Sequence, residues 1–114
     1  MPTQVFDTLT FGEWLRTQRE AHDMPLRRVA AHLDVDTSIV AKMEKNQRPA
    51  TKQHLQQLAA LFEADFESLL VMYLSDRVAY DLLDETCSEA VLQVAEQKIK
   101  YLRQKNVVQG KIEF

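Results

Sequence analysis

Short hydroxyl side chains and one lysine share the outer face of a predicted helix near the middle of the chain. Thr37 and Ser38 lie at its start, and Lys42 lies one turn further along the same face. Short side chains let a helix backbone approach a binding partner closely, and hydroxyl and ammonium groups bond to base edges or phosphates. The partial positive charge of a helix N-terminus also suits phosphate. This pattern predicts that Thr37, Ser38 and Lys42 contact bases of double-stranded DNA.

Taken alone, these residues have ordinary interpretations. Thr37 and Ser38 would more often be a solvated helix start. Lys42, Lys45 and Arg48 could be an ordinary charged surface. The surrounding segments decide between the interpretations, because two short helices joined by a tight turn within a helical bundle form a DNA-reading arrangement.

Two short helices are predicted on either side of a turn. Pro25 sets the backbone for the first, whose inner positions continue to Leu33. Asp34 lies where the chain must turn sharply, and Asp36 can cap the second helix. Asn46 ends that helix near Lys45. Asp and Asn tolerate the left-handed backbone conformation better than most residues, so both breaks are plausible without glycine.

Capping patterns and apolar spacing predict four more helices. Thr10 and Glu13 form a capping box for a helix that runs to about Asp23. Further helices are capped by Thr51, by Asp65 with an end near Leu83, and by a Thr86–Glu89 capping box with an end near Asn106. Residues 1–9 are a leader of uncertain structure, and the tail to Phe114 is expected to be loose. The expected core positions follow helical spacing, and they are Phe11, Trp14, Leu15, Leu26, Val29, Ala30, Leu33, Val40, Met43, Leu55, Leu58, Ala59, Phe62, Phe66, Leu69, Leu70, Tyr73 and Leu74.

Several of these segments resemble one known family in order along the chain. They are "FGEWLRTQRE", "RVAAHLDV", "TSIVAKMEKNQR" and "LQQLAALFEADFESLL". Together they are similar to the XRE family of helix-turn-helix regulators, which are related to the Cro and repressor proteins of lambdoid phages. The resemblance runs from Phe11 to about Leu70. It implies an all-α fold with a five-helix lambda-repressor-like domain that binds DNA.

The resemblance also implies roles for individual residues. It places the base-contacting positions on Thr37, Ser38 and Lys42. An Arg–Glu pair that ties the first helix to the end of the recognition helix would be Arg19 and Glu44, a structural pair. Where the family often carries Gln at the start of its second helix, this chain has Pro25 and Leu26. Phosphate contacts fall on Arg27, Arg28, Asn46, Gln47 and Arg48.

Composition and charge agree with a small DNA-binding protein without catalytic groups. The 114 residues carry a net charge of −3, yet residues 25–54 carry six Lys or Arg against three Asp or Glu. The single cysteine, Cys87, and the absence of a recognisable signal peptide favour a cytoplasmic location. The three histidines are widely spaced and lack ligand partners, so no metal and no cofactor are expected. No catalytic triad or glycine-rich phosphate loop is visible, which argues against an enzyme.

Apolar residues in the last third of the chain predict self-association. Leu92, Ala95, Ile99 and Leu102 recur at coiled-coil spacing. Leu70 and Leu74 lie in a helix that is apolar around most of its circumference. A homodimer held by these residues is the preferred interpretation, although this last helix could instead fold back within one chain. The rival function is an antitoxin-like module that binds a partner protein through its C-terminal helices.

These observations predict two parts. Residues 1–74 would form the DNA-binding domain, and residues 75–114 a helical extension for dimerisation. The expected function is transcriptional regulation, and repression in particular, through a palindromic operator. Related small regulators act in phage, restriction–modification and toxin–antitoxin systems, and the sequence does not choose among these settings.

Overall fold

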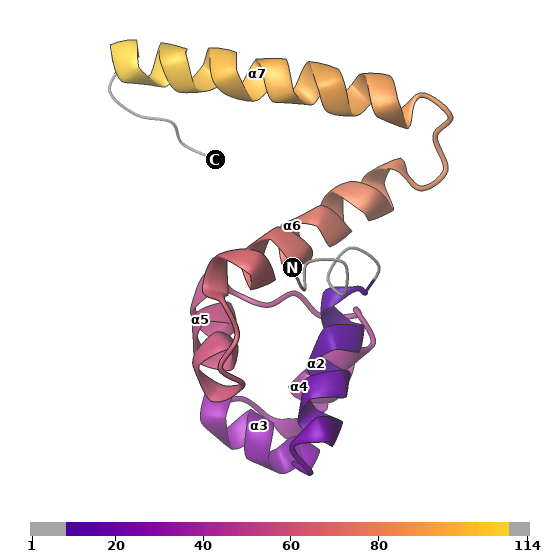
Figure 1. Ribbon diagram of the computed structural model, residues 1–114, viewed down its shortest axis with the longest axis vertical. Helices are drawn as coiled ribbons and strands as arrows, with labels where there is room; N and C mark the ends of the chain where they lie inside the picture. The colour runs from indigo at the N-terminus through magenta and orange to yellow at the C-terminus, as the bar shows by residue number, and fades with distance from the viewer. Residues whose placement is uncertain (1–8, 110–114) are drawn as a thin grey trace. The chain divides into compact units, whose positions relative to one another are not determined.

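The computed structural model describes residues 9–109, and this part of the chain contains helices and no strands. The expectations for residues 1–8 and 110–114 lie outside it. The helices, labelled as in Figure 1, are α2 (Phe11–Ala21), α3 (Leu26–Leu33), α4 (Thr37–Glu44), α5 (Lys52–Leu61), α6 (Phe66–Leu82) and α7 (Ser88–Gln109). No helix among the described residues is long and apolar enough to cross a membrane. The predicted all-α fold is confirmed.

The chain divides into two compact units. The first ends at Ala79 and contains α2 to α5 and most of α6; the second begins at Tyr80 and contains α7. The first unit therefore ends a few residues beyond the boundary at residue 74 that the sequence suggests. The reason is that residues of α6 after position 74 still bond to the N-terminal helix, as the next subsection shows.

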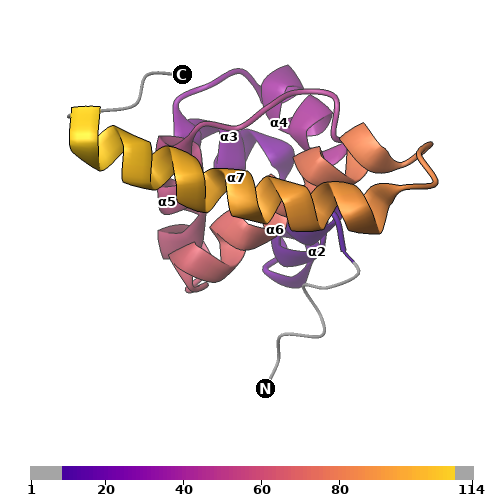
Figure 2. The same cartoon turned by 90° about the horizontal axis from the view of Figure 1, so that it is seen from above.

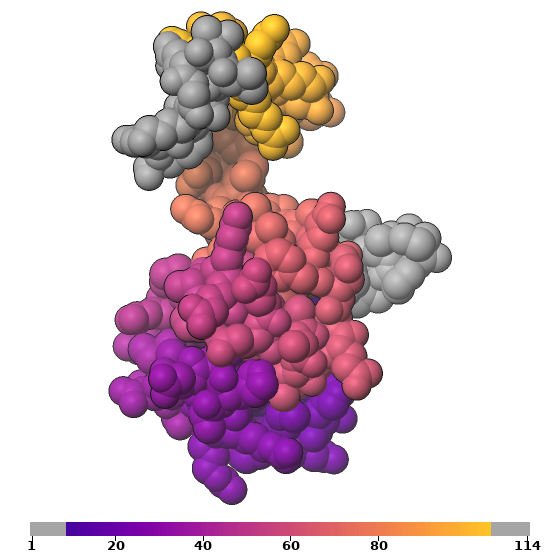
Figure 3. Space-filling model, turned by 90° about the vertical axis from the view of Figure 1, so that its left-hand side faces the viewer, coloured from indigo at the N-terminus to yellow at the C-terminus, as the bar shows by residue number. Residues whose placement is uncertain are grey.

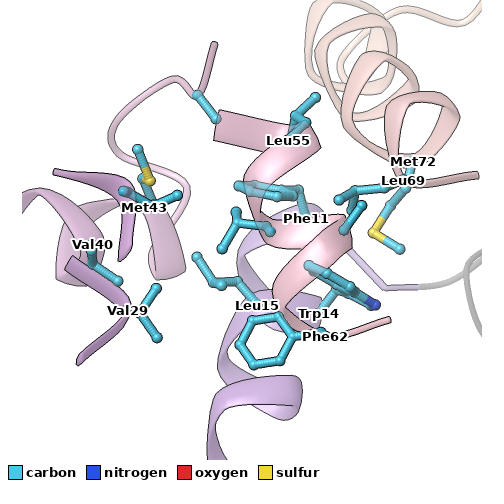
Figure 4. Close-up of a cluster of buried hydrophobic side chains, with 14 of the residues drawn as sticks. Phe11, Trp14, Leu15, Val29, Val40, Met43, Leu55, Phe62, Leu69 and Met72 are labelled. Carbon is cyan, nitrogen blue, oxygen red and sulfur yellow. The ribbon is translucent and has the colours of Figure 1, made fainter. Parts of the chain in front are cut away.

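The first unit is built around one apolar core. Side chains from α2, α3, α4, α5 and α6 point toward one another in Figure 4, and Figure 3 shows one outer face of this unit in space-filling form. Trp14 and Phe62 meet edge to face with ring centroids 5.9 Å apart. Five expected core positions behave differently: Leu26, Phe66, Leu70 and Tyr73 are only partly buried, and Leu74 is 43% exposed. Met72, which was not among the expected positions, is buried. The buried residues are Phe11, Trp14, Leu15, Val29, Ala30, Leu33, Val40, Met43, Ala50, Leu55, Leu58, Ala59, Phe62, Leu69 and Met72.

Most helix starts follow the predicted capping residues. The Thr10–Glu13 capping box is present, and Thr51 caps α5 with His54 returning the bond. Asp65 accepts hydrogen bonds from the backbone and hydroxyl of Ser68 at the start of α6.

The predicted Thr86–Glu89 capping box is wrong. Helix α7 begins at Ser88, and the carbonyl of Cys87 accepts its first intrahelical bond, from Val91. Because Cys87 occupies the cap position, Thr86 lies one residue too early to cap this helix, and no bond joins it to Glu89 among the described residues.

Candidate nucleic-acid interface

Helix α4 separates its polar residues from its apolar ones. Val40 and Met43 are 0% and 1% exposed, whereas Thr37, Ser38 and Lys42 are all exposed. Helix α4 packs against α3, its neighbour in Figure 2, and it also contacts α2. The first unit therefore holds α4 by its apolar face and leaves the predicted base-contacting residues accessible.

The turn between α3 and α4 is built without glycine. Asp34 adopts the left-handed conformation, with φ 59° and ψ 48°, and the amide of Val35 donates to the carbonyl of Ala30 at 3.0 Å. This is a helix-ending arrangement in which glycine is usual and Asp or Asn is tolerated. The predicted turn at Asp34 is thus confirmed, and so is the left-handed backbone at Asn46, where φ is 58°.

The N-terminus of α4 carries no side-chain cap. Asp36 occupies the cap position, but its carboxylate makes no capping hydrogen bond. Instead the amide of Ile39 donates to the backbone carbonyl of Asp36 at 2.9 Å. The prediction that the Asp36 side chain caps α4 is therefore wrong, because the backbone already satisfies the amide it would have bonded.

Arg19 of α2 and Glu44 of α4 form a forked ion pair. The Arg19 Nε and Nη2 atoms donate to the two carboxylate oxygens at 2.6 and 3.2 Å, and Nη1 donates to the Met24 carbonyl at 3.0 Å. Hydrogen bonding to Glu44 raises the pKa of Arg19 above its ordinary value, against the opposing effect of burial. The side chain of Glu44 is only 8% exposed. Removing Arg19 alone would leave a buried charge unpaired, at a cost of about 3 kcal/mol.

Asn46, predicted as a phosphate ligand, bonds within the chain. Its Oδ1 accepts the Gly12 amide at 3.0 Å, and its Nδ2 donates to the Thr10 hydroxyl at 3.0 Å. The backbone amide of Asn46 donates to Met43 at 3.1 Å. The side chain thus bonds to the start of α2, and the backbone amide bonds to α4. Asn46 fastens the end of α4 to the start of α2.

Gly12 makes this junction close. A Cβ atom at Gly12 would lie 2.5 Å from the Glu44 carbonyl oxygen and 2.7 Å from the Met43 carbonyl oxygen. Real Cβ atoms essentially never come within 3.0 Å of other atoms, and both obstacles are backbone. Only glycine allows α2 to pass this near the C-terminal end of α4.

Helix α6 bonds to both sides of the same junction. The Tyr73 hydroxyl accepts the Ala50 amide at 2.9 Å, in the loop that follows α4. The Asp76 carboxylate accepts the Phe11 amide at 2.7 Å, at the start of α2. The pKa of Asp76 is raised above its ordinary value, chiefly because the carboxylate is partly buried. The bond from Phe11 opposes this increase, and the negative charge of Glu13 adds to it. Sequence reasoning missed Gly12 and Asp76, and it predicted burial of Tyr73 but not its bond to Ala50. Of the two missed residues only Gly12 offered a signal, because a glycine inside a helical pattern indicates close backbone approach.

The remaining predicted DNA ligands are exposed basic or amide side chains. Arg27 and Arg28 lie in the first turn of α3. Gln47 and Arg48 lie in the loop after α4, where the Gln47 amide donates to the Lys42 carbonyl at 2.8 Å. This bond ties the backbone of the loop to α4 and leaves the Gln47 and Arg48 side chains exposed.

The predicted dimerisation residues are apolar and accessible to different degrees. Leu70 packs against the core of the first unit, and Leu74 is 43% exposed. In the second unit Leu92 is 48%, Ile99 48% and Leu102 41% exposed, and Ala95 is exposed as well. Large apolar residues exposed at these levels along one helix are typical of an interaction surface.

The fold and this site define a helix-turn-helix DNA-binding domain. Residues 15–69 match the family model described as Helix-turn-helix. These 55 of the 114 residues are similar to helix-turn-helix regulators of the XRE type, and the match supports a DNA-binding transcription regulator of that general class. Neither the curated proteins nor the solved structures contain a match to the chain.

Proposed function

We propose that the chain is a sequence-specific repressor that binds a palindromic operator as a homodimer. The exposed face of α4 carries this proposal. Thr37, Ser38 and Lys42 stand on a helix that is held from behind by Val40 and Met43. A helix supported in this way can enter the major groove as a rigid reader.

The proposed contacts divide into two kinds. Thr37, Ser38 and Lys42 read base edges, since hydroxyl and ammonium groups can bond there. Phosphates are bound by four exposed side chains that position the helix without reading sequence. Asn46 is assigned to holding the loop, because its side chain already bonds to Gly12 and Thr10. The four proposed phosphate ligands are Arg27, Arg28, Gln47 and Arg48.

A selection experiment tests both kinds of contact. The wild-type chain is used to select bound sequences from a random DNA pool, and the selection is repeated with Lys42→Ala and Arg48→Ala. Lys42→Ala should change the preferred bases, at about 1–3 kcal/mol for the lost contact. Arg48→Ala should weaken binding to all sequences alike and reduce the salt slope of affinity by about 1.

A matched control removes an exposed positive charge outside α3 and α4. Arg77→Ala on α6 should return the wild-type operator and the wild-type salt slope. An unchanged operator with Lys42→Ala would refute base reading by Lys42. A wild-type chain that selects no sequence at all would refute the proposed function.

The proposed homodimer follows from the small footprint of a single α4. One recognition helix spans only a few base pairs, whereas two related by a two-fold axis read half-sites about 34 Å apart. The apolar residues of α6 and α7 are the surfaces we assign to the interface. Leu70 and Leu74 contribute from α6, and Leu92, Ala95, Ile99 and Leu102 from α7.

The remaining features fit this proposal. We place the end of the DNA-binding domain near Ala79, where the first compact unit ends, and assign the rest of the chain to dimerisation. DNA as the ligand and a single free cysteine support a cytoplasmic location. The uninterrupted helix from Ser88 to Gln109 favours a dimerisation element over the rival antitoxin-like segment, which would order only on a partner protein.

A further inference from the structure

Charge is strictly segregated along α7 and the turn before it. From residue 84 to residue 96 every charged residue is acidic, namely Asp84, Glu85, Glu89 and Glu96. From residue 97 to residue 109 every charged residue is basic, namely Lys98, Lys100, Arg103 and Lys105. The turn and helix together thus have a negative first part and a positive second part of equal formal charge, and within α7 two acidic residues precede four basic ones.

The helix dipole accounts for only part of this pattern. Acidic residues near a helix N-terminus and basic residues near its C-terminus are stabilising, but the effect fades within the first and last turns. Glu96 and Lys98 lie in the middle of a 22-residue helix, beyond the reach of either end. The reversal of charge at mid-helix therefore needs another explanation.

The same helix carries the exposed apolar stripe. Leu92, Ala95, Ile99 and Leu102 follow 3-4-3 spacing, which places them at the a and d positions of a heptad. Glu89, Glu96 and Arg103 then fall at e positions, and Val91, Lys98 and Lys105 at g positions. Residues at e and g flank the seam, so they set the orientation of a pairing helix. A mostly apolar hollow adjoins the stripe, and it is lined by Cys87, Ala90, Val91, Val94, Ala95 and Lys98.

We propose that α7 pairs antiparallel with α7 of a second copy of this chain. This inference rests on the proposed homodimer and specifies its interface. An antiparallel arrangement brings the acidic first part of each helix against the basic second part of the other. It also opposes the two helix dipoles, whereas a parallel arrangement would place like charge on like charge along the whole seam.

One register satisfies the stripe and pairs the opposite charges that lie away from the two-fold axis. When the two-fold axis passes near residue 97, Leu92 of one copy packs on Leu102 of the second, and Ala95 packs on Ile99. Glu89 then faces Arg103 of the second copy on each side of the axis. In a parallel pair, Lys98 would instead face Arg103 of the second copy, a repulsive contact repeated twice.

The native cysteine provides a direct measurement of orientation. Cys87 is exposed and is the chain's one cysteine, so a spin label can be attached without altering the stripe. It lies about ten residues from the proposed axis on each copy. With a rise of 1.5 Å per residue, the two labels should be about 30 Å apart along the helices. A parallel pair would hold them roughly 10 Å apart, the distance between packed helix axes.

Charge reversal provides a second, independent measurement. Arg103→Glu should weaken dimerisation by about 3- to 30-fold. The new carboxylate in each copy would face Glu89 of the other copy, so the repulsion occurs twice in the dimer. Adding Glu89→Lys to this variant should restore the wild-type dissociation constant. Lys100→Glu, an equal change of charge away from the seam, serves as the matched control and should have a much smaller effect. In a parallel dimer Arg103→Glu would face Lys98 and tighten the complex.

Each outcome has one meaning. A labelled chain that is dimeric by light scattering, with a label distance near 30 Å and rescue by the double variant, supports the inference. A dimer with a short label distance, or one tightened by Arg103→Glu, overturns the antiparallel pairing and leaves the homodimer intact. A chain that remains monomeric at high concentration refutes the homodimer itself and the pairing with it.

Discussion

At the scale of single residues, Gly12 determines how α2 meets the recognition helix. Replacing it with alanine would put a Cβ within 2.7 Å of two backbone carbonyls of α4, so one helix must move. We expect Gly12→Ala to lower the free energy of unfolding by about 1–3 kcal/mol, as overpacking does. Because the shift occurs at the end of α4, operator affinity should fall as well. Denaturant unfolding and fluorescence anisotropy measure the two effects.

Thr17 offers a matched control for this substitution. It is an exposed residue of the same helix, so Thr17→Ala should change stability by less than about 0.5 kcal/mol and leave DNA affinity unchanged. If Gly12→Ala kept wild-type stability and affinity, the close approach of α2 to α4 would not restrict the domain.

Residues also differ in how well the sequence indicated their contacts. The Arg19–Glu44 pair was expected through a family resemblance, and the structure joins these side chains across 25 positions of the chain. No resemblance or spacing indicated that Asn46 would bond to Thr10 and Gly12. A carboxamide can bond to phosphate or to backbone with equal ease, and only its three-dimensional surroundings decide between them.

At the scale of elements, local sequence predicted the helices well where a cap and an apolar stripe agreed. Helix α6 was expected from Asp65 to about Leu83 and is observed from Phe66 to Leu82. The start of α7 was placed too early, because Thr86 and Glu89 have capping-box spacing and Cys87 does not resemble a cap. Helix ends fray and their boundaries vary by one or two residues, so local pattern does not fix the first residue of the helix.

The N-terminal cap of α6 predicts a specific acid sensitivity. Hydrogen bonds from the backbone and the hydroxyl of Ser68 lower the pKa of Asp65 below its usual 3.8. The unfolded chain therefore binds this proton more readily, so the contribution of the carboxylate to stability is present above the unfolded pKa and lost as pH falls through the folded pKa. We expect the melting temperature of wild type to fall relative to Asp65→Asn between about pH 5 and about pH 2. Asparagine keeps an acceptor without titrating.

Asp36 supplies the control for this experiment. It occupies a cap position but makes no side-chain capping bond, so Asp36→Asn should not reproduce this acid-dependent difference from wild type. Parallel melting curves for wild type and Asp65→Asn across the acid range would show that the Asp65 carboxylate does not stabilise α6.

At the scale of the whole molecule, the α7 stripe predicts how self-association can be broken. Ile99→Asp should place a carboxylate in an apolar interface without a partner. The variant should become monomeric and lose operator affinity, because each chain then reads a single half-site. Light scattering gives the mass, circular dichroism the helix content, and anisotropy the affinity.

Gln97→Asp adds the same charge two residues away, on the opposite side of the helix from the stripe, and should remain dimeric. A folded Ile99→Asp dimer would place the interface elsewhere.

The sequence indicated apolar self-association here, but it placed the boundary between the two parts at residue 74. Local pattern did not show that Asp76 reaches back to the Phe11 amide, because that bond spans 65 positions.

The two bonds made by α6 have a thermodynamic consequence. Helix α6 bonds to the loop after α4 through Tyr73 and to the first turn of α2 through Asp76. It also bears the exposed Leu74 and Val78. Any displacement of α6 favoured by self-association must act on those bonds. The same coupling free energy then appears in operator affinity, with equal size in both directions. In the proposed homodimer, occupancy of the operator would then change more steeply with protein concentration than binding by a lone domain allows.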